Sequence, residues 1–152
     1  ATRMWFLERD AAAFAASGKP EAKPGAQWRY SSRSYMILSR IAAQTIGGGP
    51  QGFSDYVQTR LLAPIGMGDV RLQFDAAGSP MGGNGFFASA RDWAQFGQFY
   101  LQKGLVGDHT LLPDGWTDFV SRPTLEMGYT QFFAATYRRG VELGREGGLI
   151  VN

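Results

Sequence analysis

The chain of 152 residues contains no cysteine, one histidine and three lysines. The absence of cysteine excludes disulfides, thiolate zinc sites and a cysteine nucleophile, and it leaves the redox compartment open. The single histidine, His109, lies in a turn-like stretch and cannot build a multi-histidine metal site. Thiolate and multi-histidine metal sites are therefore not expected. No apolar run approaches the ~20 residues that a membrane helix needs, so we expect no membrane span.

The N-terminal residues lack the apolar core of a signal peptide. For a chain that is part of a longer protein, this leaves two locations open for that parent protein: periplasmic or secreted, and cytoplasmic. Hydrophobic residues make up 44% of the chain and charged residues 18%, which is typical of a globular protein. The net charge is only +2, and the basic residues are scattered. A nucleic-acid partner is therefore not expected.

Hydrophobic periodicity predicts a mostly helical chain with a few short strands towards its C-terminus. The expected helices span residues 10–16, 32–46, 53–62, 91–102 and 113–120. The side chains expected to face inward are, helix by helix from 32–46 onwards, Leu38, Ile41, Ala42 and Thr45; Phe53, Tyr56, Val57 and Leu61; Trp93, Phe96, Gly97, Tyr100 and Leu101; and Trp116, Phe119 and Val120.

The stops between these helices come from glycine and proline, as at Gly47–Pro50. Ser89 and Asp92 form a capping-box pattern before the helix at 91–102. Apolar and polar residues alternate over 69–75, which predicts a strand, and a glycine-rich loop follows over 78–85. Further strands are expected over 129–137 and 149–151.

Tyr30 precedes two serines at the expected start of the helix at 32–46, and two interpretations are open. In the structural one, Ser31 caps the helix and the rings of Tyr30 and Tyr35 pack as a hydrophobic staple. In the chemical one, Tyr30 handles protons for a serine nucleophile, and Ser31 or Ser32 faces the reacting groups. A phenol has a pKa of about 10, so this role needs a nearby ammonium.

The loop Gly82-Gly83-Asn84-Gly85-Phe86-Phe87 also has two interpretations. It is either a connector before the capped helix or one wall of a binding site. Glycines allow backbone to approach a ligand closely, and the phenylalanines supply apolar surface. The residues expected to bind substrate are Ser32, Gly83, Asn84, Gly85 and Phe86.

An ordered set of motifs resembles the serine β-lactamase-like hydrolases. Pro24-Gly25-x-x-Trp28-x-Tyr30-Ser31-Ser32 resembles the second motif of that superfamily. Leu62-x-Pro64-Ile65-Gly66-Met67, the stretch from Gly82-Gly83 to Phe96-Gly97, and Leu112-Pro113-x-x-Trp116 resemble the segments that follow it. The superfamily includes class C β-lactamases, penicillin-binding proteins, related esterases and 6-aminohexanoate-dimer hydrolases. The resemblance covers residues 4 to 125.

The resemblance implies the roles of two residues. The catalytic tyrosine of the superfamily falls on Tyr30, and the asparagine of its Tyr-x-Asn motif falls on Ser32, a departure that is closer to the esterase branches. The S-x-x-K motif is absent, because Ala16, Pro20 and Tyr100 stand three residues before the lysines. The K-T-G motif and its H-x-G variants are absent as well.

We therefore expect residues 1–125 to be the helical subdomain of a β-lactamase/transpeptidase-like α+β fold, and residues 126–152 to be the start of the returning sheet or an irregular tail. The implied parent is a serine hydrolase that forms an acyl-enzyme with a small ester, amide or β-lactam, and the resemblance implies neither a metal nor an organic cofactor. The isolated chain would be an inactive fragment, with exposed apolar surface through which it forms homo-oligomers. The alternative is a non-catalytic helical module that binds a partner.

Overall fold

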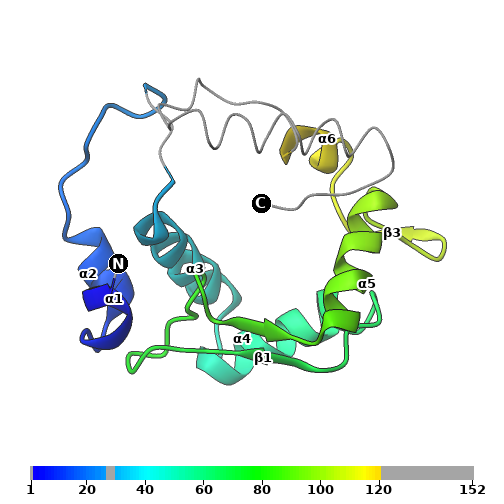
Figure 1. Ribbon diagram of the computed structural model, residues 1–152, viewed down its shortest axis with the longest axis horizontal. Coiled ribbons are helices and arrows are strands. Elements are labelled where there is room, and N and C mark those ends of the chain that lie inside the picture. Colours follow the sequence, from blue (N-terminus) through cyan, green and yellow to red (C-terminus); the bar gives the residue numbers. More distant parts are fainter. Residues whose placement is uncertain (1, 27–29, 121–152) are drawn as a thin grey trace. The chain divides into compact units, whose positions relative to one another are not determined.

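The computed structural model describes residues 2–26 and 30–120. The chain divides into two compact units, one formed by Ala1–Pro20 and Ser31–Gln95 and the other by Glu21–Tyr30 and Phe96–Asn152. The predicted mostly α fold class is confirmed: helices predominate in the described residues, which also contain two antiparallel two-stranded sheets (Figure 1). The expected boundary at residue 125 and the expected strands beyond it lie outside the described residues.

The elements follow one another in a simple order. They are α1 (Thr2–Phe6), α2 (Ala11–Ala16), α3 (Ser32–Ile46), α4 (Gly49–Val57) with its π-helical continuation η1 (Gln58–Leu62), β1 (Val70–Leu72), β2 (Phe86–Ala88), α5 (Ala90–Leu101), β3 (Leu105–Val106), β4 (His109–Thr110) and α6 (Trp116–Val120). The predictions for α2, α3 and α5 agree with these bounds to within one residue. The elements α1, β2, β3 and β4 were not predicted. No helix among the described residues is long and apolar enough to cross a bilayer.

The core of the first unit lies between its first three helices. Met4, three alanines of α2 and Met36 of α3 form one buried cluster, and Met36 has no exposed surface. The small alanine side chains let α2 lie directly on α3. Asp10 begins α2, because its Oδ1 accepts a hydrogen bond of 2.7 Å from the Ala13 N–H.

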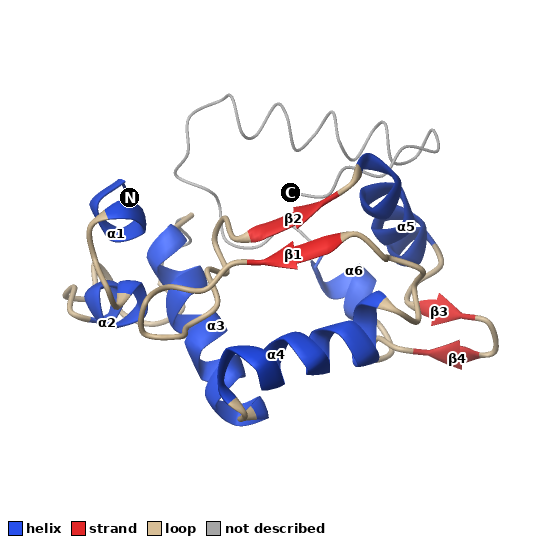
Figure 2. Cartoon of the chain, turned by 90° about the horizontal axis from the view of Figure 1, so that it is seen from below, coloured by secondary structure: helices blue, strands red, loops and turns tan. Residues whose placement is uncertain are grey.

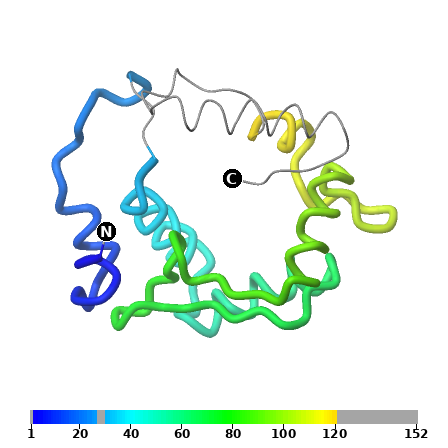
Figure 3. The backbone as a smooth tube through the Cα atoms, viewed as in Figure 1, coloured from blue at the N-terminus to red at the C-terminus, as the bar shows by residue number. Residues whose placement is uncertain are grey.

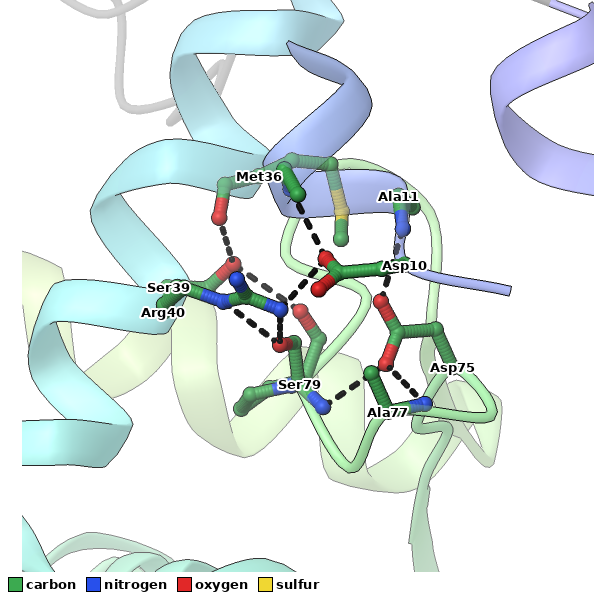
Figure 4. Close-up of polar contacts among 10 residues, drawn as sticks. Asp10, Ala11, Met36, Ser39, Arg40, Asp75, Ala77 and Ser79 are labelled. Carbon is green, nitrogen blue, oxygen red and sulfur yellow. Dashed lines mark hydrogen bonds and ion pairs between the residues drawn. The ribbon is translucent and has the colours of Figure 1, made fainter. Parts of the chain in front are cut away.

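A polar cluster, shown in Figure 4, joins α2, α3 and the loop before β2. The Arg40 guanidinium forms an ion pair with the Asp10 carboxylate. Its Nε and one terminal nitrogen also donate to the buried Ser79 hydroxyl at 3.0 and 2.8 Å. The hydrogen bond from Arg40 lowers the pKa of Asp10, and the hydrogen bond from the Ala13 N–H lowers it further.

Asp75 holds the loop side of this cluster. Its Oδ2 accepts from the Ala11 N–H at 2.9 Å, and its Oδ1 accepts from the N–H groups of Ala77 and Ser79 at 3.0 and 2.8 Å. The Ser39 hydroxyl lies 2.9 Å from the Pro80 carbonyl oxygen, to which it donates. The start of α2 and the middle of α3 are thereby fixed to a segment much later in the sequence (Figure 4).

The helix predicted over 53–62 begins four residues earlier, at Gly49. Gly47 and Gly48, with φ of 79° and 71°, end α3 and redirect the chain without an intervening loop. Pro50 then fits the first turn of α4, where a missing N–H costs no helical hydrogen bond. The segment predicted only as a helix stop is therefore also a helix start.

The end of the same helix widens into a π-helical turn. The Ala63 N–H donates to the Gln58 carbonyl at 2.8 Å, and the Met67 N–H donates to the Leu62 carbonyl at 2.9 Å, both five residues back. Leu62, the last residue of η1, and Met67 beyond it are both buried.

Strands β1 and β2 pair antiparallel, with Val70 opposite Ala88 and Leu72 opposite Phe86 (Figure 2). The predicted strand over 69–75 is shorter than expected, although an isolated bridge between Phe74 and Pro80 extends the pairing. Figure 3 follows the chain from β1 through the intervening loop and back into β2. Strand β2 lacks the apolar–polar alternation that would have predicted it.

The capping box before α5 is confirmed. The Asp92 N–H donates to the Ser89 hydroxyl oxygen at 3.2 Å, and that hydroxyl donates to the Asp92 carboxylate at 2.5 Å. The carboxylate also accepts from the Gly68 N–H at 2.9 Å. These hydrogen bonds, led by that of Ser89, lower the pKa of Asp92, which is a buried side chain.

Several predicted inward faces are exposed. In α3, Leu38 and Ile41 are 60% and 52% exposed, and the buried residue is Met36. In α5, Trp93 and Leu101 are exposed, whereas Asp92 and Phe99 are buried. The prediction failed because periodicity locates an apolar stripe but does not say whether another element covers it.

The remaining exposed members of the predicted faces are Ala42, Thr45, Tyr56, Trp116, Phe119 and Val120. Helix α6 begins at Trp116, three residues later than expected, because Gly115 has a φ of 75° and ends a preceding turn. In that turn the Trp116 N–H donates to the Pro113 carbonyl at 3.0 Å. His109 is exposed, in β4 of a two-stranded hairpin (Figure 2).

Replacing Arg40 tests the polar cluster. Its ion pair with Asp10 involves two partly exposed side chains and contributes at most about 1 kcal/mol. The buried Ser79 hydroxyl would lose its donors, which costs about 1–3 kcal/mol. We expect Arg40→Met to lower the free energy of unfolding by an amount in that second range, measured by urea denaturation. Arg60→Met, an exposed arginine of η1, is the control; equal losses in both variants would contradict this account.

The capping box predicts a pH dependence of stability. The folded pKa of Asp92 lies below its ordinary value of 3.8, so its stabilisation is complete above that value and is lost as the pH falls through the folded pKa. Urea midpoints should therefore drop between about pH 5 and about pH 2. Asp92→Asn should flatten part of this drop. Asp114→Asn, which removes an exposed carboxylate, controls for net charge, and an equally flattened profile there would refute the assignment.

Candidate functional site

Helix α3 begins at the serine pair, but not through a side-chain cap. Ser31 is extended, with φ −148° and ψ 115°, and its side chain makes no capping hydrogen bond. Its carbonyl accepts from the N–H groups of Ser34 and Tyr35 at 3.0 and 3.4 Å. The interpretation of Ser31 as a capping hydroxyl is therefore wrong, although the residue does stand at the N-cap position.

Ser32 is the first residue of α3 and is half-buried. Its hydroxyl makes no hydrogen bond within residues 2–26 and 30–120. A half-buried hydroxyl in this state can donate to, and accept from, a bound molecule. The position that the resemblance assigns to substrate thus carries an available polar group.

Tyr30 is about half exposed, at 51%, and directly precedes the N-cap residue. It belongs to the second unit, whereas the other predicted site residues belong to the first. In the sequence, Tyr30 is separated from Ser32 by Ser31 alone. The predicted staple between Tyr30 and Tyr35 stays a prediction.

The glycine loop lies against the first two turns of α3. A Cβ atom added to Gly82 would lie 2.7 Å from the Ser39 hydroxyl oxygen and 3.0 Å from the Tyr35 carbonyl oxygen. A Cβ atom added to Gly83 would lie 2.7 Å from Cη2 of Trp5 and 3.7 Å from Cβ of Ser32. Both glycines are therefore required by close approach, and Ser32 and Gly83 are brought together.

Asn84 and Gly85 form the turn into β2. Their N–H groups both donate to the Met81 carbonyl, at 3.1 and 2.7 Å. Gly85 is buried, and its own carbonyl accepts from the Gln73 N–H at 2.7 Å. Asn84 is exposed at the tip of this turn. The turn thus presents the side-chain amide of Asn84, while the N–H and carbonyl groups of Gly85 are occupied by hydrogen bonds within the chain.

Phe86 opens β2 and packs on Trp93 of α5, with ring centroids 5.3 Å apart and planes inclined by 55°. Trp93 and the neighbouring Phe87 remain about half exposed. The loop over 82–86 therefore has an indole at each end, that of Trp5 beside Gly83 and that of Trp93 beside Phe86.

Sequence reasoning missed Trp5. It lies in α1, a five-residue helix that has no cap pattern to reveal it. A pair of adjacent glycines does signal that something bulky comes close, but it does not say what. Within the described residues, no group of three histidine, cysteine, aspartate or glutamate side chains is placed to hold a metal ion.

The sequence profile of the family described as Beta-lactamase matches residues 1–149, nearly the whole chain. The chain belongs to the beta-lactamase family. Its membership places it among the serine hydrolases of that superfamily, and the match extends beyond the 4–125 segment that carries the motif resemblance. No curated protein matches the chain. The helical elements around α3 and α5 are thus a helical part of the beta-lactamase fold.

Proposed function

We propose that the protein containing this chain is a serine hydrolase that forms an acyl-enzyme with an ester, amide or β-lactam, and that Tyr30 handles the protons. One observation carries the proposal. In a member of the beta-lactamase family, the sequence Tyr30-Ser31-Ser32 stands at the start of α3, and the Gly83 backbone lies against Ser32.

The proposed reaction has two acyl transfers. The serine oxygen attacks the substrate carbonyl carbon, and the Tyr30 phenolate takes the serine proton. The tetrahedral intermediate collapses, the bond to the leaving group breaks, and the phenol returns the proton to the leaving oxygen or nitrogen. Water then attacks the acyl-enzyme, with its proton passing to the phenolate and on to the serine oxygen.

The serine nucleophile and its lysine are proposed to come from sequence outside these residues. No lysine here has a serine three residues before it. The ammonium of that lysine would favour the phenolate form of the tyrosine. This mechanism requires neither a metal nor an organic cofactor.

Ser32 is proposed to contact the substrate through its available hydroxyl. The remaining contacts are proposed to come from the backbone of Gly83, the exposed Asn84 and the ring of Phe86, with the buried Gly85 shaping the turn that presents Asn84. A hydroxyl reaches less far than the carboxamide of asparagine and offers one donor rather than two. This favours a simple ester over a penicillin as the substrate.

Tyr30→Phe in the complete gene product should lower the acylation rate by about a hundredfold or more, because a general base typically contributes that much. The ring remains, so the melting temperature should barely change. The measurement is the pre-steady-state burst with a p-nitrophenyl ester, together with a thermal melt.

Tyr35→Phe is the matched control, since Tyr35 is similarly exposed, at 45%, and stands one helical turn into α3. It should leave the burst rate unchanged. An unaltered burst rate in Tyr30→Phe would return Tyr30 to a packing role and would contradict its part in the reaction. A complete gene product that shows no burst at all would favour the non-catalytic module.

The isolated 152-residue chain should hydrolyse neither p-nitrophenyl esters nor a chromogenic cephalosporin above a buffer blank. The reason is the absence of the S-x-x-K nucleophile and lysine. Turnover that follows the 16.6 kDa chain through two orthogonal chromatography steps would contradict the proposed source of the nucleophile.

A further inference from the structure

The edge of the Trp5 indole touches the backbone of the glycine loop. A Cβ atom at Gly83 would lie 2.7 Å from Cη2 and 3.0 Å from Cζ2 of that ring, closer than a real Cβ can stand. The φ angle of Gly83 is not in the left-handed region, so the restriction is one of space alone. Only a residue without a side chain lets the ring come this near.

The indole also packs against the core of the first unit. Trp5 is partly buried and packs on the cluster that contains Met4 and Met36, which are among the most buried side chains described. The indole therefore contacts both this cluster and Gly83, and Trp5 keeps some exposed surface. Its position does not depend on the short helix α1 alone.

Ser32 adjoins the same point. The Cβ of Ser32 lies 3.7 Å from where a Gly83 side chain would begin, and the Ser32 hydroxyl has no partner within the described residues. A carbonyl group bound at this hydroxyl would have the outer part of its acyl chain beside the loop and the indole edge. At the other end of the loop, the ring of Phe86 packs on that of Trp93.

We propose that Trp5 is a specificity-determining residue of the hydrolase, and this rests on the function proposed above. Its indole edge contacts the acyl group and favours an uncharged apolar chain of medium length over acetyl. Each methylene that leaves water for such a contact gains free energy in the transition state as well as in the complex. The preference therefore appears in kcat/KM, mainly through KM.

The test uses the complete gene product and two substrates, p-nitrophenyl hexanoate and p-nitrophenyl acetate. Trp5→Phe keeps a ring against Met4 and Met36 but removes the atoms that reach Gly83. We expect the hexanoate-to-acetate ratio of kcat/KM to fall about tenfold, the effect of losing one apolar contact of methylene size or more. Trp116→Phe, an exposed tryptophan of α6, is the matched control and should leave the ratio unchanged.

Gly83→Ala is the second variant, because it displaces the indole without truncating it. It should lower the same ratio, and it decides the question if Trp5→Phe does not fold. Its control is Gly97→Ala in α5, where an added Cβ meets no atom within 4 Å. Thermal melts on all four variants separate a change in selectivity from a loss of folded protein.

The outcomes distinguish the two proposals. A wild-type enzyme that is active and depends on Tyr30, with an unchanged ester ratio in folded Trp5→Phe and Gly83→Ala, overturns the role of Trp5 alone. A folded wild-type protein that hydrolyses no ester overturns this inference, and one that also hydrolyses no amide and no β-lactam overturns the proposed function as well. A ratio that falls in both variants and in neither control supports the inference.

Discussion

The guanidinium of Arg40 binds the Asp10 carboxylate ahead of α2 and the buried Ser79 hydroxyl in the loop before β2. The hydroxyl of the preceding residue, Ser39, donates to the Pro80 carbonyl in the same loop. These two adjacent residues of α3 thus fix where the glycine segment begins. Because the loop starts there, Gly83 comes to lie against Ser32 and against Trp5 rather than in solvent.

The positions of α2, α3 and α5 could be predicted from local signals. Gly47 ends α3 and the Ser89–Asp92 box begins α5, and both devices act within a few residues of the backbone that they satisfy. The buried faces of these helices could not be predicted. Apolar periodicity marked Leu38 and Ile41, which are exposed, and overlooked Asp92, which is buried because three donors satisfy its carboxylate.

The sequence predicted single residues of the candidate site but not which of them lie close together. Motif order pointed to Ser32 and Gly83 separately, and only the fold makes them neighbours. Trp5 could not be predicted, because the adjacent glycines indicate a close approach without identifying the residue that approaches. The Arg40 cluster was missed for a related reason: the partners of Arg40 lie 30 and 39 residues away from it in the sequence, beyond any local spacing rule.

The long separation of these partners also orders events along the chain during its synthesis. Ala11 and Asp75 are 64 residues apart, and Arg40 and Ser79 are 39 apart. Helices α2 and α3 therefore leave the ribosome well before the loop that completes their polar contacts. Until that loop arrives, the alanine face of α2 and Met36 are the contacts available to hold the two helices together. Closing the loop is then a late, entropically costly step that converts a loose helical pair into a fixed one.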